Sequence, residues 1–84
     1  MARTRLAVAQ VRGLHGLQGA VRVEVLTDRP EARFATGQVL HVEDDDRPLT
    51  IVAAQPVEDG PGWRLRFREI PNRQSAEWLR DLYL

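Results

Sequence analysis

The residues best suited to chemistry lie in one stretch, VRGLHGLQGAVRVEV (residues 11–25), where three glycines surround His15. Three uses compete: a loop that binds phosphate, a loop that carries a catalytic histidine, and a shaped turn presented to a partner. A P-loop needs four residues between its glycines, then Lys and Ser/Thr at the start of a helix. This stretch has neither that spacing nor a lysine. It also lacks the dinucleotide-binding pattern GxGxxG, because its glycines are spaced differently and no helix is predicted to follow them. The GxxG loop of KH domains matches only as a short pattern from a mixed α/β fold.

A catalytic histidine needs a nucleophile or an orienting group within reach. Ser75 is the only serine and falls in a predicted helix, there is no cysteine, and His41 lies on a predicted strand between apolar neighbours. These residues do not make up a nucleophile, base and orienting group, so no catalytic residue is predicted and the chain is not expected to be an enzyme.

Two histidines without cysteine argue against a zinc site, and EDDD (residues 43–46) lacks the alternating ligands of a calcium loop. No metal or cofactor is expected.

A bulged hairpin accounts for the glycines of the same stretch. Gly13, Gly16 and Gly19 would take positive φ values, or let neighbouring backbone approach where a side chain would clash. This interpretation leaves His15 at the tip of the loop with no apolar reason to be there. A turn residue that makes hydrogen bonds is the commoner role for such a histidine.

Alternation of apolar and polar residues predicts the strands that hold this loop. In WRLRFRE (residues 63–69) the apolar residues point inward and three arginines point outward. Those arginines either pair with acids across the sheet or contact phosphates. Five strands are predicted, at residues 6–12, 20–26, 38–43, 49–56 and 62–69. The fourth has apolar residues on both faces and is expected to be the most enclosed.

Two helical segments complete the predicted elements. A single turn is capped by Thr27 or Asp28 and has Pro30 near its start. The segment PNRQSAEWLRDLYL predicts a helix of only about ten residues with Asn72 as N-cap, followed by LYL as a candidate last strand. The apolar face of that helix would consist of Ala76, Leu79 and Tyr83. Because closure removes exposed edges, we predict a mainly β fold, a small closed antiparallel six-stranded β-barrel with one short C-terminal helix.

The composition fits a single β-barrel domain spanning residues 1–84, with 43% hydrophobic and 29% charged residues. The net charge is zero, which argues against a protein that coats nucleic-acid phosphates nonspecifically. All 12 basic residues are arginine. Arginine suits bidentate contacts with phosphate or carboxylate, but a compositional bias of the genome would produce the same count.

The absence of cysteine and of a long apolar run predicts a cytoplasmic protein without membrane contact. A monomer is the expected state.

The run VRGLHGLQGAVRVEVLTDRPEARFATGQVL, followed by IPNRQSAEWLRDLYL, resembles the N-terminal domain of the RimM family of ribosome maturation factors. That family has a G-x-H-G-x-x-G loop, a TD…P…RF segment and an R…A…LR helix leading to a short apolar strand, and all occur here in order. Two positions depart from the family pattern. Gln18 stands where a basic residue is usual, and Ala20 stands where a glutamate is usual. The weaker charge of the loop argues against a purely electrostatic role.

The resemblance implies a non-enzymatic ribosome assembly factor built on a six-stranded barrel, followed in the family by a second barrel that this chain lacks. It implies association with the free 30S subunit, maturation of the subunit head and processing of 16S rRNA. The implied partners are a ribosomal protein of that head and, as a further candidate, 16S rRNA. We take the loop, held stiffly on the barrel rim, as the docking surface. The candidate partner-binding residues are Arg12, Gly13, His15, Gly16, Gly19 and Arg22.

Two other functions stay open on the sequence alone. A stand-alone barrel that binds single-stranded RNA would present aromatic side chains to the bases, whereas this chain has five aromatic residues, two of them assigned to the core. A reductase-like barrel that holds a flavin is supported only by analogy of fold.

Overall fold

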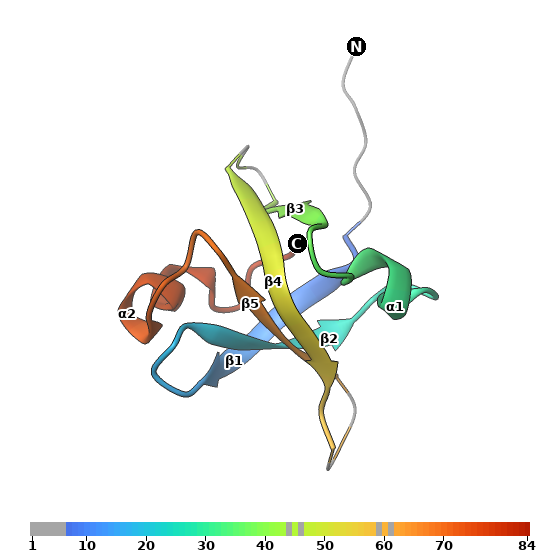
Figure 1. The fold of residues 1–84 in the computed structure, drawn as a ribbon, viewed down its shortest axis with the longest axis horizontal. Helices are drawn as coiled ribbons and strands as arrows, with labels where there is room; N and C mark the ends of the chain where they lie inside the picture. Colours follow the sequence, from blue (N-terminus) through green and yellow to red (C-terminus); the bar gives the residue numbers. More distant parts are fainter. Residues whose placement is uncertain (1–6, 44, 46, 59, 61) are drawn as a thin grey trace.

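The strands and helices of the computed structural model are described for residues 7–43, 45, 47–58, 60 and 62–84. The strands are β1 (Ala9–His15), β2 (Ala20–Val25), β3 (Val39–His41), β4 (Pro48–Pro56) and β5 (Trp63–Phe67). A helical turn, α1 (Pro30–Arg33), follows β2, and α2 (Arg73–Ala76) runs directly into a 3-10 turn, η1 (Glu77–Leu79) (Figure 1). All five predicted strands are therefore present. The first begins at Ala9 rather than at residue 6, which lies outside the described residues, as do Asp44 and Asp46 of the EDDD turn.

The strands form one antiparallel sheet in the order β1-β2-β5-β4-β3. The last residues, 82–84, return to the other side of β1, where the N–H of Leu84 donates to the carbonyl of Ala9 (2.8 Å). The N–H of Glu43 donates to the carbonyl of Tyr83 (2.8 Å). Within the described ranges these contacts amount to one isolated β-bridge, between Gln10 and Tyr83, and not to a sixth strand, because the chain is still turning at Asp81, where φ is 64°. The mainly β antiparallel prediction is confirmed, but the sheet is not closed into the predicted six-stranded barrel.

The core consists of the inward side chains of each strand, as the alternation predicted. Val21 and Val23 of β2 and Leu65 and Phe67 of β5 are all buried. Phe34, which follows α1, is buried at one end of the sheet, with its ring centroid 5.5 Å from that of the half-buried Trp63. The described part of the chain contains no helix that is both long and apolar enough to cross a membrane.

The prediction that the fourth strand would be the most enclosed is wrong. Leu49 and Ile51 at its start are buried, but Val52 is 39% exposed and Ala53 is also exposed. The register between β4 and β5 shifts between Ile51 and Ala53. This bulge interrupts the alternation, and the second half of the strand borders a hollow on the outer face of the sheet.

The C-terminal helix begins where predicted and ends early. The side chain of Asn72 accepts a hydrogen bond from the N–H of Ser75 (2.8 Å), and the Ser75 hydroxyl accepts one from the N–H of Asn72 (3.3 Å), forming a capping box. Arg80 is extended (φ −54°, ψ 131°), so the chain leaves the helix there. Ala76 and Leu79 are buried as predicted, but Tyr83 is 38% exposed because it lies beyond the helix.

The N-terminal cap of α1 also differs from the prediction. Arg29, not Thr27 or Asp28, occupies the cap position, and it makes no side-chain capping hydrogen bond. Thr27 instead accepts a hydrogen bond from the N–H of Arg29 at its hydroxyl (3.2 Å). Pro30 is the first residue of the turn. An N–H at this position would have no partner within the helix, so the lack of one in proline removes no hydrogen bond.

A carboxylate joins the start of β4 to the turn that follows β5. Glu69 accepts hydrogen bonds from the Thr50 N–H (2.6 Å) and the Thr50 hydroxyl (2.8 Å). Partial burial disfavours the charged form of Glu69, but the two bonds from Thr50 outweigh it and hold the pKa of Glu69 below its ordinary value. The contact therefore links the two strands most strongly when Glu69 is ionised.

This link predicts a pH-dependent contribution to stability. Because the folded pKa of Glu69 lies below the unfolded value, the carboxylate stabilises the fold above the unfolded pKa, and the contribution is lost as the pH falls through the folded pKa. We expect Glu69→Ala to lower the free energy of unfolding by about 1 kcal/mol at pH 7, a figure reduced for solvent screening. Urea unfolding at pH 7 and at about pH 3 measures the difference. The exposed Glu31→Ala variant is the control, and an equal loss for Glu69→Ala at both pH values would contradict the assignment.

Candidate functional site

The glycine-rich loop is the turn between β1 and β2, and it carries the bulge that the sequence predicted. The register shifts between Val11 and Gly13, after which Gly13 pairs with Arg22 and His15 pairs with Ala20. Val21 and Val23 of β2 point into the core, so Ala20 and Arg22 lie on the outer face together with their partners on β1. The bulge therefore places His15 on the outer face of the sheet at the base of the loop.

The three glycines have different roles. Gly16 has a φ of +72° and open space around it, whereas Gly19 has a φ of +85° and is buried against the backbone before α2. A Cβ atom on Gly19 would lie 2.7 Å from the carbonyl oxygen of Ile70 and 2.8 Å from that of Asn72. The prediction is confirmed for Gly16 and Gly19. It is wrong for Gly13, which has neither a positive φ nor a close neighbour and instead follows the bulge.

Hydrogen bonds from the start of α2 hold the same loop. The N–H of Arg73 donates to the carbonyl of Leu17 (3.0 Å), and the Arg73 guanidinium donates to the carbonyl of Gly16 (3.3 Å). Figure 1 shows the β1–β2 turn beside α2. The side chain of Leu17 remains 81% exposed at the tip. The loop is thus fixed at its backbone and presents its side chains to solvent.

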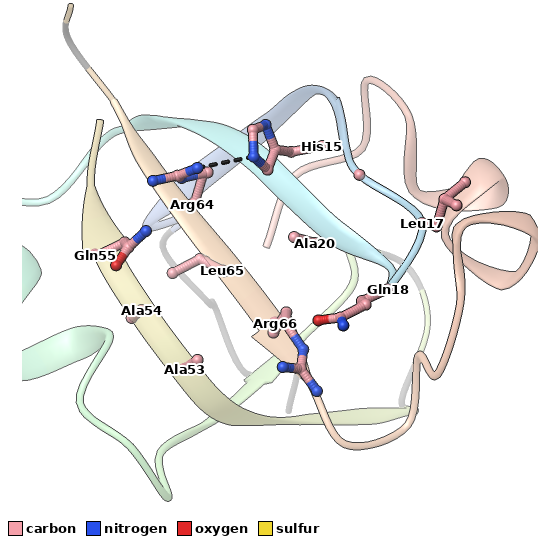
Figure 2. Close-up of a pocket in the computed structure, with 11 residues that line it drawn as sticks. His15, Leu17, Gln18, Ala20, Ala53, Ala54, Gln55, Arg64, Leu65 and Arg66 are labelled. Carbon is pink, nitrogen blue, oxygen red and sulfur yellow. Dashed lines mark hydrogen bonds between the residues drawn. The ribbon is translucent and has the colours of Figure 1, made fainter. Parts of the chain in front are cut away.

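His15 makes a contact that the sequence analysis missed. Its Nε2 atom lies 2.8 Å from Nη1 of Arg64 (Figure 2). A guanidinium group only donates hydrogen bonds, so Nε2 is the acceptor and the contact belongs to the neutral imidazole. Arg64 comes from the outward arginine row of β5, and that row was the only signal in the sequence for this partner. The other residues considered for catalysis lie elsewhere in the fold: Ser75 caps α2, and His41 is the last residue of β3.

A hollow of about 490 Å³ lies between the loop and the outer face of β4 and β5 (Figure 2). Small side chains form much of its lining and polar ones stand around it. The lining residues are His15, Gly16, Leu17, Gln18, Ala20, Ala53, Ala54, Gln55, Arg64, Leu65 and Arg66. Of the six predicted partner-binding residues, the hollow brings together His15 and Gly16. The other four, Arg12, Gly13, Gly19 and Arg22, lie outside its lining.

Arginine side chains concentrate on this outer face. Arg12 and Arg22 are exposed on β1 and β2, and Arg22 lies directly opposite Arg64 of β5. Like charges that lie directly opposite each other on paired strands destabilise a sheet. In the described ranges, no group of three or more His, Cys, Asp or Glu residues is arranged to hold a metal ion. The arginines Arg12, Arg22 and Arg64 suit this face to anions.

Comparison with known proteins gives consistent matches. The family model described as the RimM N-terminal domain matches residues 6–84. The ribosome maturation factor RimM of Thermobifida fusca is 43% identical over 81 residues, which cover 95% of this chain and 46% of that protein. The RimM proteins of Lactobacillus helveticus and Cutibacterium acnes are 42% and 38% identical, covering 92% and 99% of this chain and 44% and 45% of theirs. The chain spans about half the length of the curated relatives it matches.

The geometry of the loop predicts a graded effect of alanine at its three glycines. Gly19→Ala should lower the free energy of unfolding by about 2–4 kcal/mol, because it adds a backbone clash to a strained φ. Gly16→Ala should cost about 1 kcal/mol, for φ alone. Gly13→Ala should change stability by less than about 0.5 kcal/mol. Urea unfolding of the three variants measures the order, and a Gly19→Ala variant as stable as Gly13→Ala would contradict the close approach.

Proposed function

Since the chain belongs to the RimM N-terminal domain family, we propose that it is a domain of a ribosome assembly factor that docks on the free 30S subunit through the β1–β2 loop. In this proposal the protein supports maturation of the subunit head and processing of 16S rRNA, without catalysing a reaction itself. Its partners are a ribosomal protein of the head and, in addition, 16S rRNA. The domain acts as a monomer in the cytoplasm.

The fixed shape of the loop is the observation that supports this proposal most strongly. The backbone of Gly19 lies against the carbonyls of Ile70 and Asn72, and Arg73 bonds to the carbonyls of Gly16 and Leu17. A surface that is ordered before binding loses little conformational entropy when it docks. The exposed Leu17 at the tip provides an apolar contact in the middle of that surface.

The charges beside the loop fit a ribonucleoprotein partner. Arg12 and Arg22 are exposed on the two strands that lead into and out of the loop. The Arg12 guanidinium donates to the side-chain oxygen of Gln10 (3.2 Å), which orients it along the strand. In the proposal, Gly16 and Gly19 shape the surface and the bulge before Gly13 sets its angle. The two arginines and His15 contact the partner. Exposed arginines of this kind accelerate association with a negatively charged particle and make it dependent on salt.

The aromatic residues argue against the alternative of base stacking on this face. Phe34 and Phe67 are buried and Trp63 is half-buried in the core. Trp78 is 37% exposed, but the Arg47 guanidinium covers its ring at 4.2 Å from the centroid. None of the described residues that line the hollow beside the loop is aromatic. Contacts through shape and charge are therefore the better supported mode of binding.

A double substitution tests the docking proposal. In the full-length protein, His15→Ala with Arg22→Ala should weaken association with free 30S subunits by about tenfold at low salt, equivalent to about 1.4 kcal/mol. The effect should shrink as salt is raised, because exposed charges are screened. Co-sedimentation with 30S subunits at several salt concentrations measures it.

The matched control is His41→Ala with Arg33→Ala, which removes the same residue types from β3 and α1. This control should associate as the unaltered protein does. Unchanged association of the His15 and Arg22 double variant at every salt concentration would contradict the assignment of the loop as the docking surface.

A further inference from the structure

The hollow beside the loop combines small residues with hydrogen-bonding side chains. Ala20 and Ala53 end at Cβ, which leaves space above the outer face of the sheet. His15 and Arg64 stand at one end of this space, and Gln18 and Arg66 lie at the other (Figure 2). None of the described residues that line the hollow is acidic. Its chemistry therefore suits an elongated anion.

The arginines here are not neutralised by the described chain. Within the described ranges, neither Arg64 nor Arg66 forms an ion pair. Arg64 faces Arg22 across the strand pair, and its Nε atom is buried without a hydrogen-bond partner among the described residues. Like charges placed opposite each other lower the stability of the sheet. An external anion would relieve this repulsion, so the arrangement favours binding of one.

The spacing along β5 fits a repeated phosphate. Arg64 and Arg66 are two residues apart, so their side chains leave the same face of the strand at points about 6.6 Å apart. This distance is similar to the separation of neighbouring phosphates along an RNA strand. Each guanidinium can bind a phosphate through two parallel hydrogen bonds. The amides of Gln18 and Gln55 both donate and accept, as does a ribose hydroxyl.

We propose that this hollow is a groove for the sugar–phosphate backbone of a single RNA strand, with Arg64 and Arg66 as phosphate ligands and His15 as a further contact. The inference rests on the proposed function and deepens it, because it assigns the RNA contact to a surface next to the docking loop. None of the described residues that line the groove is aromatic, so in this proposal the bases are not held by stacking and binding does not depend on sequence. An extended peptide could not add to the sheet here, because β5 is paired on both sides, with β2 and β4.

Fluorescence anisotropy with a labelled ten-nucleotide oligouridine at low salt tests the groove. Ala53→Glu, which puts an acid in the floor, should weaken binding about fivefold, while the same change at the exposed Ala35 should leave it within about twofold. Arg66→Gln should also weaken binding about fivefold and reduce the slope of log affinity against log salt by about 0.7, the value for one phosphate contact to a single strand. Arg33→Gln, on α1, is its control and should have neither effect.

Three results would overturn the proposal: no binding of the oligouridine by the unaltered chain at low salt, equal binding by the groove variants and their controls, or tighter and equally groove-dependent binding of a polyglutamate peptide. The last would assign the groove to an acidic protein segment. Circular dichroism shows whether each variant is folded, and both Ala53 and Arg66 are exposed.

The docking proposal can fail separately, since it is judged by 30S association of the His15 and Arg22 double variant. Loss of 30S association in the double variant, together with RNA binding that Arg66→Gln and Ala53→Glu leave unchanged, would leave the docking proposal standing and remove the groove.

Discussion

The backbone of Gly19 meets the carbonyls of Ile70 and Asn72 at distances that leave no space for a side chain. This approach joins the first hairpin of the sheet to the segment that starts α2, although the two are about fifty residues apart in the chain. The hydrogen bonds that Arg73 makes to the loop carbonyls depend on the same approach. The close approach and these bonds together hold the loop against the start of α2.

The fixed loop in turn sets the geometry of the outer face. The bulge after Val11 brings His15 into register with Ala20, and His15 then accepts a hydrogen bond from Arg64 two strands away. The hollow owes its walls to this arrangement, with the loop on one side and β4 on the other. In our proposals, a docking surface and a neighbouring groove for an anion therefore share one rigid support, which would suit a factor that recognises protein and RNA together.

Local patterns in the sequence predicted much of the fold, because alternation and capping act over a few residues. The inward valines of β2, the Asn72 cap and the positive φ values at Gly16 and Gly19 follow from such patterns. What the sequence did not reveal depends on register between distant strands. The pairing of His15 with Arg64, the exposed second half of β4 and the open sheet all arise from bulges and chain ends that no local period encodes. Family resemblance identified the loop, but not the arginines of β5 that complete its surroundings.

The order of the free loop tests the central claim most directly, because it is measured before any partner binds. Backbone ¹⁵N relaxation should give residues 16–19 order parameters of about 0.8 or more, close to those of rigid backbone. Order parameters below about 0.6 in the unaltered chain would contradict a loop held by Gly19 and Arg73.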